Sequence, residues 1–102
     1  MTPEADIAQS RAAIRYEAAL AAWYVIKSEL ESAGLTPTLF GSLAQGDFRG
    51  HSDIDIIVKL GDSGMSRSAV ERIVSSASSD IPVDLFFVED LTPSDLEALL
   101  GT

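Results

Sequence analysis

The chain has 102 residues, the length of one small domain, with 46% hydrophobic and 23% charged residues. This balance excludes a disordered chain, and the length excludes a large multidomain enzyme. The sequence contains no cysteine and one histidine. Disulfides and thiolate metal sites are therefore excluded, and a zinc site built on histidines is disfavoured.

The net charge is −9, from 7 basic and 16 acidic side chains. Binding to a nucleic-acid backbone needs clustered lysine and arginine, so we expect no nucleic-acid partner. The charge is compatible with a basic protein partner or with a site filled by metal cations. No apolar run approaches the roughly 20 residues needed to cross a bilayer, and the N-terminus is unlike a secretory signal. We therefore expect a cytoplasmic protein with no membrane association.

The first element in chain order is a long helix over about residues 2–33, which are rich in Ala, Glu, Leu and Arg. Asp6 is expected to cap its main section, and Gly34 stands where the helix would stop. We see no linker or internal repeat, so the chain is expected to form a single domain over residues 1–102.

The apolar residues of this helix form two stripes at helical spacing. The Ile14 stripe consists of Ile14, Ala18, Ala21 and Val25. The Trp23 stripe consists of Tyr16, Leu20, Trp23 and Leu30. Together they are wider than one core-facing surface requires. Either both stripes are core, or Tyr16, Leu20 and Trp23 contact a partner.

Short apolar runs then predict strands over residues 35–40, 53–60 and 82–88. Pro37 indicates that the first strand is irregular or lies at a sheet edge. A loop is predicted over residues 41–52 and a helix over 65–76. Thr92 is the expected N-cap of a last helix, with Pro93 at its first position. This order predicts an α/β (α+β) domain, with a small mixed sheet of three or four strands flanked by helices.

Three aspartates interrupt the apolar strands. Asp53 and Asp55 stand two residues apart, so their side chains share one strand face with Cα atoms about 6.5 Å apart. Carboxylates in an apolar strand are unfavourable unless compensated, and oxygen ligands favour Mg²⁺ or Mn²⁺. If the strands are neighbours, Asp84 completes a cluster of three. Such a cluster can hold two metals about 3.5–4 Å apart for in-line displacement at phosphorus.

The segment before these acids has phosphate-binding character. Gly41 and Gly46 let the backbone approach a phosphate, and Ser42 offers a hydroxyl group. A Gly-Ser turn or an Asp-x-Asp pair alone is common on a solvated surface. The joint pattern of Gly-Ser, a ten-residue spacer, Asp-x-Asp and a later strand aspartate is much more specific.

This combined pattern resembles the signature of the nucleotidyltransferase superfamily, whose fold is shared with DNA polymerase β. The matching residues are Gly41, Ser42, Asp53, Asp55 and Asp84, and Ser52 directly precedes the first aspartate, as is usual. The short chain is similar to the minimal nucleotidyltransferases, which often act as antitoxins of HEPN-domain toxins.

The resemblance implies that Asp53, Asp55 and Asp84 are catalytic and bind two Mg²⁺ ions, with Mn²⁺ as an alternative. It implies that ATP is the substrate and that its phosphates are held at Gly41 and Ser42. Further nucleotide contacts are expected from Gly46, Arg49 and Ser52. The implied reaction transfers AMP to a tyrosine hydroxyl of the partner toxin, and pyrophosphate leaves.

The chain departs from the family at Gln45, where members often have an arginine before the second glycine. Arg49 is close enough in sequence to replace that phosphate contact, or it is a solvated loop cation. His51 is either a nucleotide contact or a plain loop residue. Only 14 residues follow the last strand, so the acceptor is expected to bind from outside or across a homo- or hetero-oligomer.

Three functions stay open. The first is an enzyme that adenylylates a HEPN-type toxin. The second is a non-catalytic antitoxin that neutralises its partner by contact. The third is a transferase for a small molecule such as an aminoglycoside-like acceptor. The carboxylate triad favours the first over the second, and the lack of an acceptor domain weighs against the third.

Overall fold

A three-stranded mixed sheet organises the molecule. The computed structural model describes residues 3–48, 52–78 and 80–101, with side chains from residue 11 onward. The elements in chain order are α1 (Pro3–Ser32), β1 (Thr36–Phe40), α2 (Gly41–Gln45), β2 (Ile54–Lys59), α3 (Arg67–Ser78), β3 (Val83–Phe87), the 3₁₀ turn η1 (Val88–Asp90) and α4 (Pro93–Leu100). All the predicted helices and strands are present. The α+β class is thereby confirmed.

The sheet has the order β1-β2-β3, with β1 antiparallel and β3 parallel to the central strand. α3 makes the crossover between the two parallel strands. The register places Phe40, Asp55 and Asp84 in one row across the sheet. β1 is an edge strand, as its proline predicted, since proline has no N–H to donate to a second neighbour.

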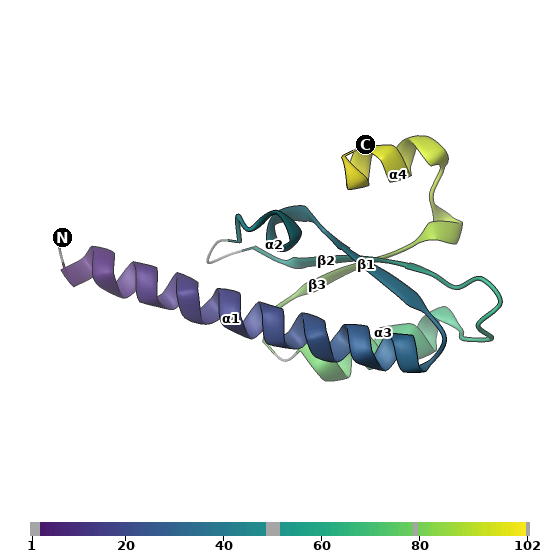
Figure 1. Cartoon of the computed structure of the whole chain (residues 1–102), viewed down its shortest axis with the longest axis horizontal. Helices are drawn as coiled ribbons and strands as arrows, with labels where there is room; N and C mark the ends of the chain where they lie inside the picture. Colours follow the sequence, from purple (N-terminus) through teal and green to yellow (C-terminus); the bar gives the residue numbers. More distant parts are fainter. Residues whose placement is uncertain (1–2, 49–51, 79, 102) are drawn as a thin grey trace.

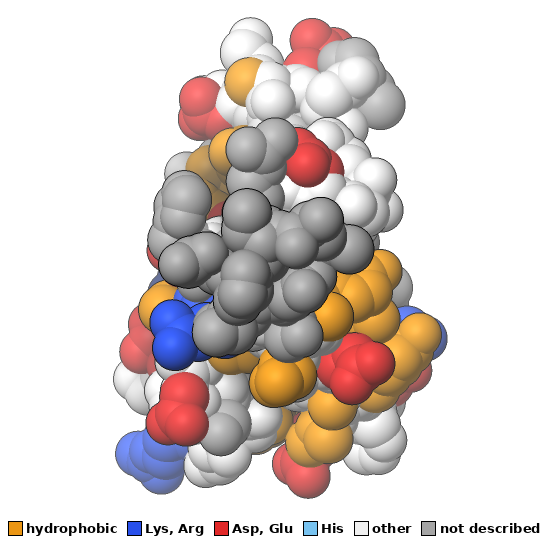
Figure 2. Space-filling model, turned by 90° about the vertical axis from the view of Figure 1, so that its left-hand side faces the viewer, with side chains coloured by type: hydrophobic (Ala, Val, Ile, Leu, Met, Phe, Trp, Pro, Cys, Tyr) orange, Lys and Arg blue, Asp and Glu red, His pale blue; other side chains and the backbone are white. Residues whose placement is uncertain are grey.

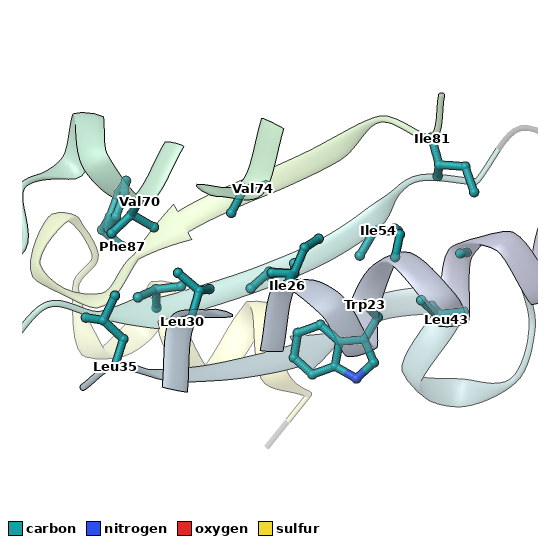
Figure 3. Packing of buried hydrophobic residues seen from close by; sticks show 14 of the residues in the cluster. Trp23, Ile26, Leu30, Leu35, Leu43, Ile54, Val70, Val74, Ile81 and Phe87 are labelled. Carbon is teal, nitrogen blue, oxygen red and sulfur yellow. The ribbon is translucent and has the colours of Figure 1, made fainter. Parts of the chain in front are cut away.

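One face of the sheet carries the core. α1 and α3 cover this face, and α4 lies on the opposite side (Figure 1). Ile54, Ile56 and Val58 of β2 are fully buried beneath the two helices. Ile26 and Leu30 of α1 gather around them with residues of α3 (Figure 3). Alternation along β2 therefore sends Asp55 to the opposite face.

The two apolar stripes of α1 differ in burial. Trp23 is only 8% exposed and Leu30 is fully buried, while Tyr16 and Leu20 pack against the same core. Trp23 and Leu30 are therefore core residues, while a partner contact of the partly buried Tyr16 and Leu20 stays a prediction. The Ile14 stripe is exposed along its whole length, so the prediction that both stripes are core is wrong. The reason is that the sheet and α3 cover only one side of a long helix.

The short helix α2 was not predicted, whereas the cap of α4 was. α2 is a short helix at the start of the segment predicted as a loop, and Leu43 anchors it in the core. At α4 the predicted cap is confirmed, since Thr92 and Asp95 form a reciprocal capping box and Pro93 follows. The side chain of Asp6 lies outside the described residues. No helix in the described part of the chain combines the length and apolar character needed to span a membrane.

Candidate active site

Asp55 and Asp84 lie side by side on the sheet face opposite the core. The parallel register of β2 and β3 pairs them directly, and their side chains hydrogen-bond to each other. The adjacency that the sequence left conditional is therefore present.

The pKa of Asp55 is raised above its ordinary value. Burial is the largest cause, followed by the negative charge of Asp84, the charge of Asp53 and the hydrogen bond with Asp84. Asp55 is half-buried and Asp84 is exposed at the surface. Like charges this close favour a shared proton or a bound cation, because either relieves their repulsion.

Asp53 lies one residue before β2, and it acts on Asp55 as a nearby charge. Within residues 3–48, 52–78 and 80–101, no three acidic or histidine side chains are already arranged to hold a metal ion. The donor chemistry still suits a hard divalent cation, since carboxylate oxygens are its preferred ligands. Asp55 and Asp84 would hold such an ion, with Asp53 as the nearest further carboxylate. The predicted two-metal arrangement stays a prediction.

Gly41 brings α2 against this carboxylate pair. It follows Phe40, which pairs with Asp55 across β1 and β2, and its φ is +75°. A Cβ atom at this position would overlap Oδ2 of Asp55 and lie 3.0 Å from its Cγ. Only glycine combines this φ with so close an approach. The first-turn amides of α2, which have no intrahelical acceptor, therefore begin beside the acids.

Gly46 ends α2 rather than meeting the acids. It takes the left-handed conformation with φ +78°, and its N–H donates to carbonyl groups of the helix it closes. A Cβ atom there would have no neighbour within 4 Å. The structure thus gives Gly46 a turn-forming role, and its predicted phosphate contact stays a prediction. Gln45, a departure from the expected pattern, is the last residue of α2 and is exposed.

Arg15 of α1 reaches the segment that leads into Asp53. Its Nη2 donates a hydrogen bond of 3.2 Å to the carbonyl oxygen of Ser52. Its Nε is buried and has no hydrogen-bond partner within the described part of the chain. The sequence offered no signal for this contact, because 37 residues separate the two positions. Arg49 and His51, both considered as nucleotide contacts, lie outside the described residues.

Aromatic and apolar groups surround the acids on this face. Phe40 and Phe86 form a tilted pair with ring centroids 5.7 Å apart. Beside them is a pocket of about 380 Å³ between β1, α2 and the end of α4. Its lining includes Phe40, Gly41, Gln45 and Leu99. Gly41 lines this pocket and also lies against Asp55, whereas none of the three aspartates is part of the lining.

The sequence of this chain matches a protein-family model. The model described as "Polymerase beta, Nucleotidyltransferase" matches residues 26–99, which is more than half of the chain. The matched span contains Gly41, Ser42 and all three aspartates, and it begins within α1. The search of curated proteins returned no match, and neither did the search of solved structures.

Proposed function

The chain belongs to the polymerase β nucleotidyltransferase family, and from this premise we propose that it transfers AMP from ATP to a tyrosine hydroxyl of a partner protein. The family supports nucleotidyl transfer as the reaction class. The observation that carries the proposal is the Asp55–Asp84 pair directly beside Gly41. Acidic groups for phosphorus chemistry and a backbone approach for phosphates thus share one sheet face.

The residues have separate tasks in this proposal. The amides of Gly41 and Ser42 bind the triphosphate, since the first turn of a helix presents free N–H groups. Two divalent cations, when bound at the aspartates, supply positive charge that offsets a triphosphate of about −4. The acceptor oxygen bonds to the α-phosphorus, and the bond from that phosphorus to pyrophosphate breaks. Asp84 takes the acceptor proton, because its carboxylate is exposed where an acceptor can approach.

The Asp55–Asp84 pair is unfavourable for stability, and this favours an enzyme over an antitoxin that acts only by contact. Burial and neighbouring negative charge both oppose the ionised form of Asp55. A protein that only covers its partner has no use for this arrangement, whereas an enzyme needs it.

The acceptor is proposed to be a basic protein, and specifically a HEPN-domain toxin. Without the three site aspartates the chain still has 13 acidic and 7 basic side chains, a net charge of −6. Such a surface attracts a basic partner and repels nucleic acid. The resemblance of the sequence to the minimal nucleotidyltransferases, in its motif and its short length, supports the toxin as that partner.

Label transfer from ATP tests the proposal. The protein is incubated with Mg²⁺ and with cell lysate or the product of any neighbouring gene as acceptor, with label on the α-phosphate in one tube and on the γ-phosphate in another. We expect α-label alone to reach the partner. Chelation of Mg²⁺ and Asp84→Asn should each abolish it, while Asp62→Asn, at an exposed turn outside the site, should leave it unchanged.

Other outcomes distinguish the alternatives. Transfer of γ-label would reject nucleotidyl transfer. No transfer of either label, with a stable complex still formed, would establish the contact-only antitoxin. Transfer to an aminoglycoside-like compound but not to protein would establish the small-molecule enzyme.

A further inference from the structure

The outward side of α1 presents an uncovered apolar surface. Ile14 is 66% exposed and Val25 is 48% exposed, and Ala18 and Ala21 between them are exposed as well. Tyr24 beside the stripe is 64% exposed. Three of the four large hydrophobic side chains that are exposed in the described residues therefore lie on this helix. Viewed from the end where α1 begins, hydrophobic side chains lie at the surface next to acidic ones (Figure 2).

The spacing within the Ile14 stripe is symmetric. The successive steps between Ile14, Ala18, Ala21 and Val25 are four, three and four residues, so the spacing is the same in both chain directions. Its large residues are at the ends and its small residues at the centre. A two-fold interface requires such a self-complementary surface, because each copy presents the same patch to the other.

We propose that two copies of this chain associate through α1, with the helices antiparallel and the two-fold axis between Ala18 and Ala21. Ile14 of one copy then packs on Val25 of the other, and Ala18 packs on Ala21. Alternating spacings of four and three residues are typical of the contact line between two paired helices. The alanines at the centre allow the two helix backbones to approach closely.

The charges beside the stripe are complementary in this arrangement and determine its direction. Arg11 and Glu29 are both exposed, and their separation of 18 positions corresponds to five full helical turns, so they share one flank. In the antiparallel pair, this flank of one copy lies next to the same flank of the other copy. Arg11 of one copy then lies within about 1.5 Å, along the helix axis, of Glu29 of the other, which gives two ion pairs. In a parallel pair they would lie about 27 Å apart along the axis.

The surface is separate from the candidate active site. The residues of the Ile14 stripe are exposed and lie outside the core, whereas Asp55 and Asp84 lie on the sheet face opposite the one that α1 covers. Self-association therefore leaves the acids accessible, and the proposal does not depend on the proposed reaction. The family match begins at Ile26, so the stripe belongs to a part of the helix outside the matched span.

Sedimentation of the full chain at increasing concentration tests the proposal. A small interface of this kind predicts a dimer with a Kd in roughly the micromolar range. Ala18→Glu should raise the Kd by about tenfold or more, since it places a charge at the centre of the seam. Ala13→Glu is the matched control, because Ala13 is exposed on the same helix but off the stripe. Circular dichroism should show both variants folded.

Charge reversal tests the direction of pairing. Arg11→Glu and Glu29→Arg should each weaken the dimer several-fold, and the double variant should restore it. Two single weakenings without restoration would contradict the antiparallel pairing. A monomer at all concentrations, or a dimer that Ala18→Glu leaves unchanged, would overturn the proposal.

Cross-linking adds an independent measure, because the chain has no cysteine of its own. In the antiparallel pair, Ile14→Cys mixed with Val25→Cys should cross-link through a short bismaleimide. Ile14→Cys alone should not, since its two copies would lie about 16.5 Å apart along the axis. Efficient cross-linking of Ile14→Cys alone would instead show a parallel pair and reject the proposed one.

Discussion

Replacing Gly41 with alanine should damage both the fold and the acidic pair. The residue has φ +75°, and an added Cβ would overlap Oδ2 of Asp55. Gly46, at the other end of α2, has nearly the same φ of +78°, but its Cβ would meet nothing within 4 Å. The two glycines therefore separate the cost of backbone conformation from the cost of collision with Asp55.

The expected magnitudes follow from these two terms. A left-handed alanine costs about 1–2 kcal/mol, and the reduced entropy of the unfolded chain offsets about 0.4–1 kcal/mol of this. Gly46→Ala should therefore cost about 1 kcal/mol, or a Tm loss of about 4–8 °C. Gly41→Ala must also push the Asp55 side chain from its rotamer, which adds about 1 kcal/mol. Its Tm loss should be about twice as large.

Thermal unfolding of the two single variants, measured by circular dichroism, gives the first comparison. The double variant Gly41→Ala with Asp55→Ala gives the second, because it removes the atoms that the new Cβ would strike. We expect the additional cost of Gly41→Ala over Gly46→Ala to disappear in the Asp55→Ala background. Equal Tm losses for the two glycine variants, or an undiminished cost in that background, would refute the close approach of α2 to Asp55.

Two further predictions concern Asp55 and the core. The pKa of Asp55 is raised on folding, so its contribution to stability is fully present below its ordinary value of 3.8 and is lost as the pH rises through the folded value. Without divalent cations, Asp55→Asn should therefore raise the Tm at neutral pH, and the gain should fade towards low pH; a lower Tm at neutral pH would contradict the crowding of charges. Trp23→Glu should cost about 3–5 kcal/mol or abolish folding, because Trp23 is buried. Tyr24→Glu, at the exposed neighbouring position, should change the Tm little. If Trp23→Glu and Tyr24→Glu lowered the stability equally in chemical denaturation, the assignment of the buried and exposed faces of α1 would be contradicted.

Much of the candidate site was predictable from local sequence. The spacing of the Gly-Ser and Asp-x-Asp motifs is read directly from the sequence. Alternation along the strand predicted that Asp55 lies on the sheet face opposite the buried isoleucines. The cap at Thr92 depends on residues three positions apart, so it too was predictable. The short helix α2 was not. Five residues rarely form a helix by propensity alone, and this one depends on Leu43 reaching the core.

The sequence by itself determined the elements, the family pattern and the acidic residue types. Only the tertiary structure decided which of these residues meet. The Asp55–Asp84 pair depends on the parallel pairing of β2 and β3 across 29 residues of chain, and the contact of Arg15 with Ser52 spans 37. The exposed side of α1 was decided in the same way, because both stripes are apolar and only one can face the sheet. Local patterns state what a surface is able to bury, and the packing of distant segments determines what it does bury.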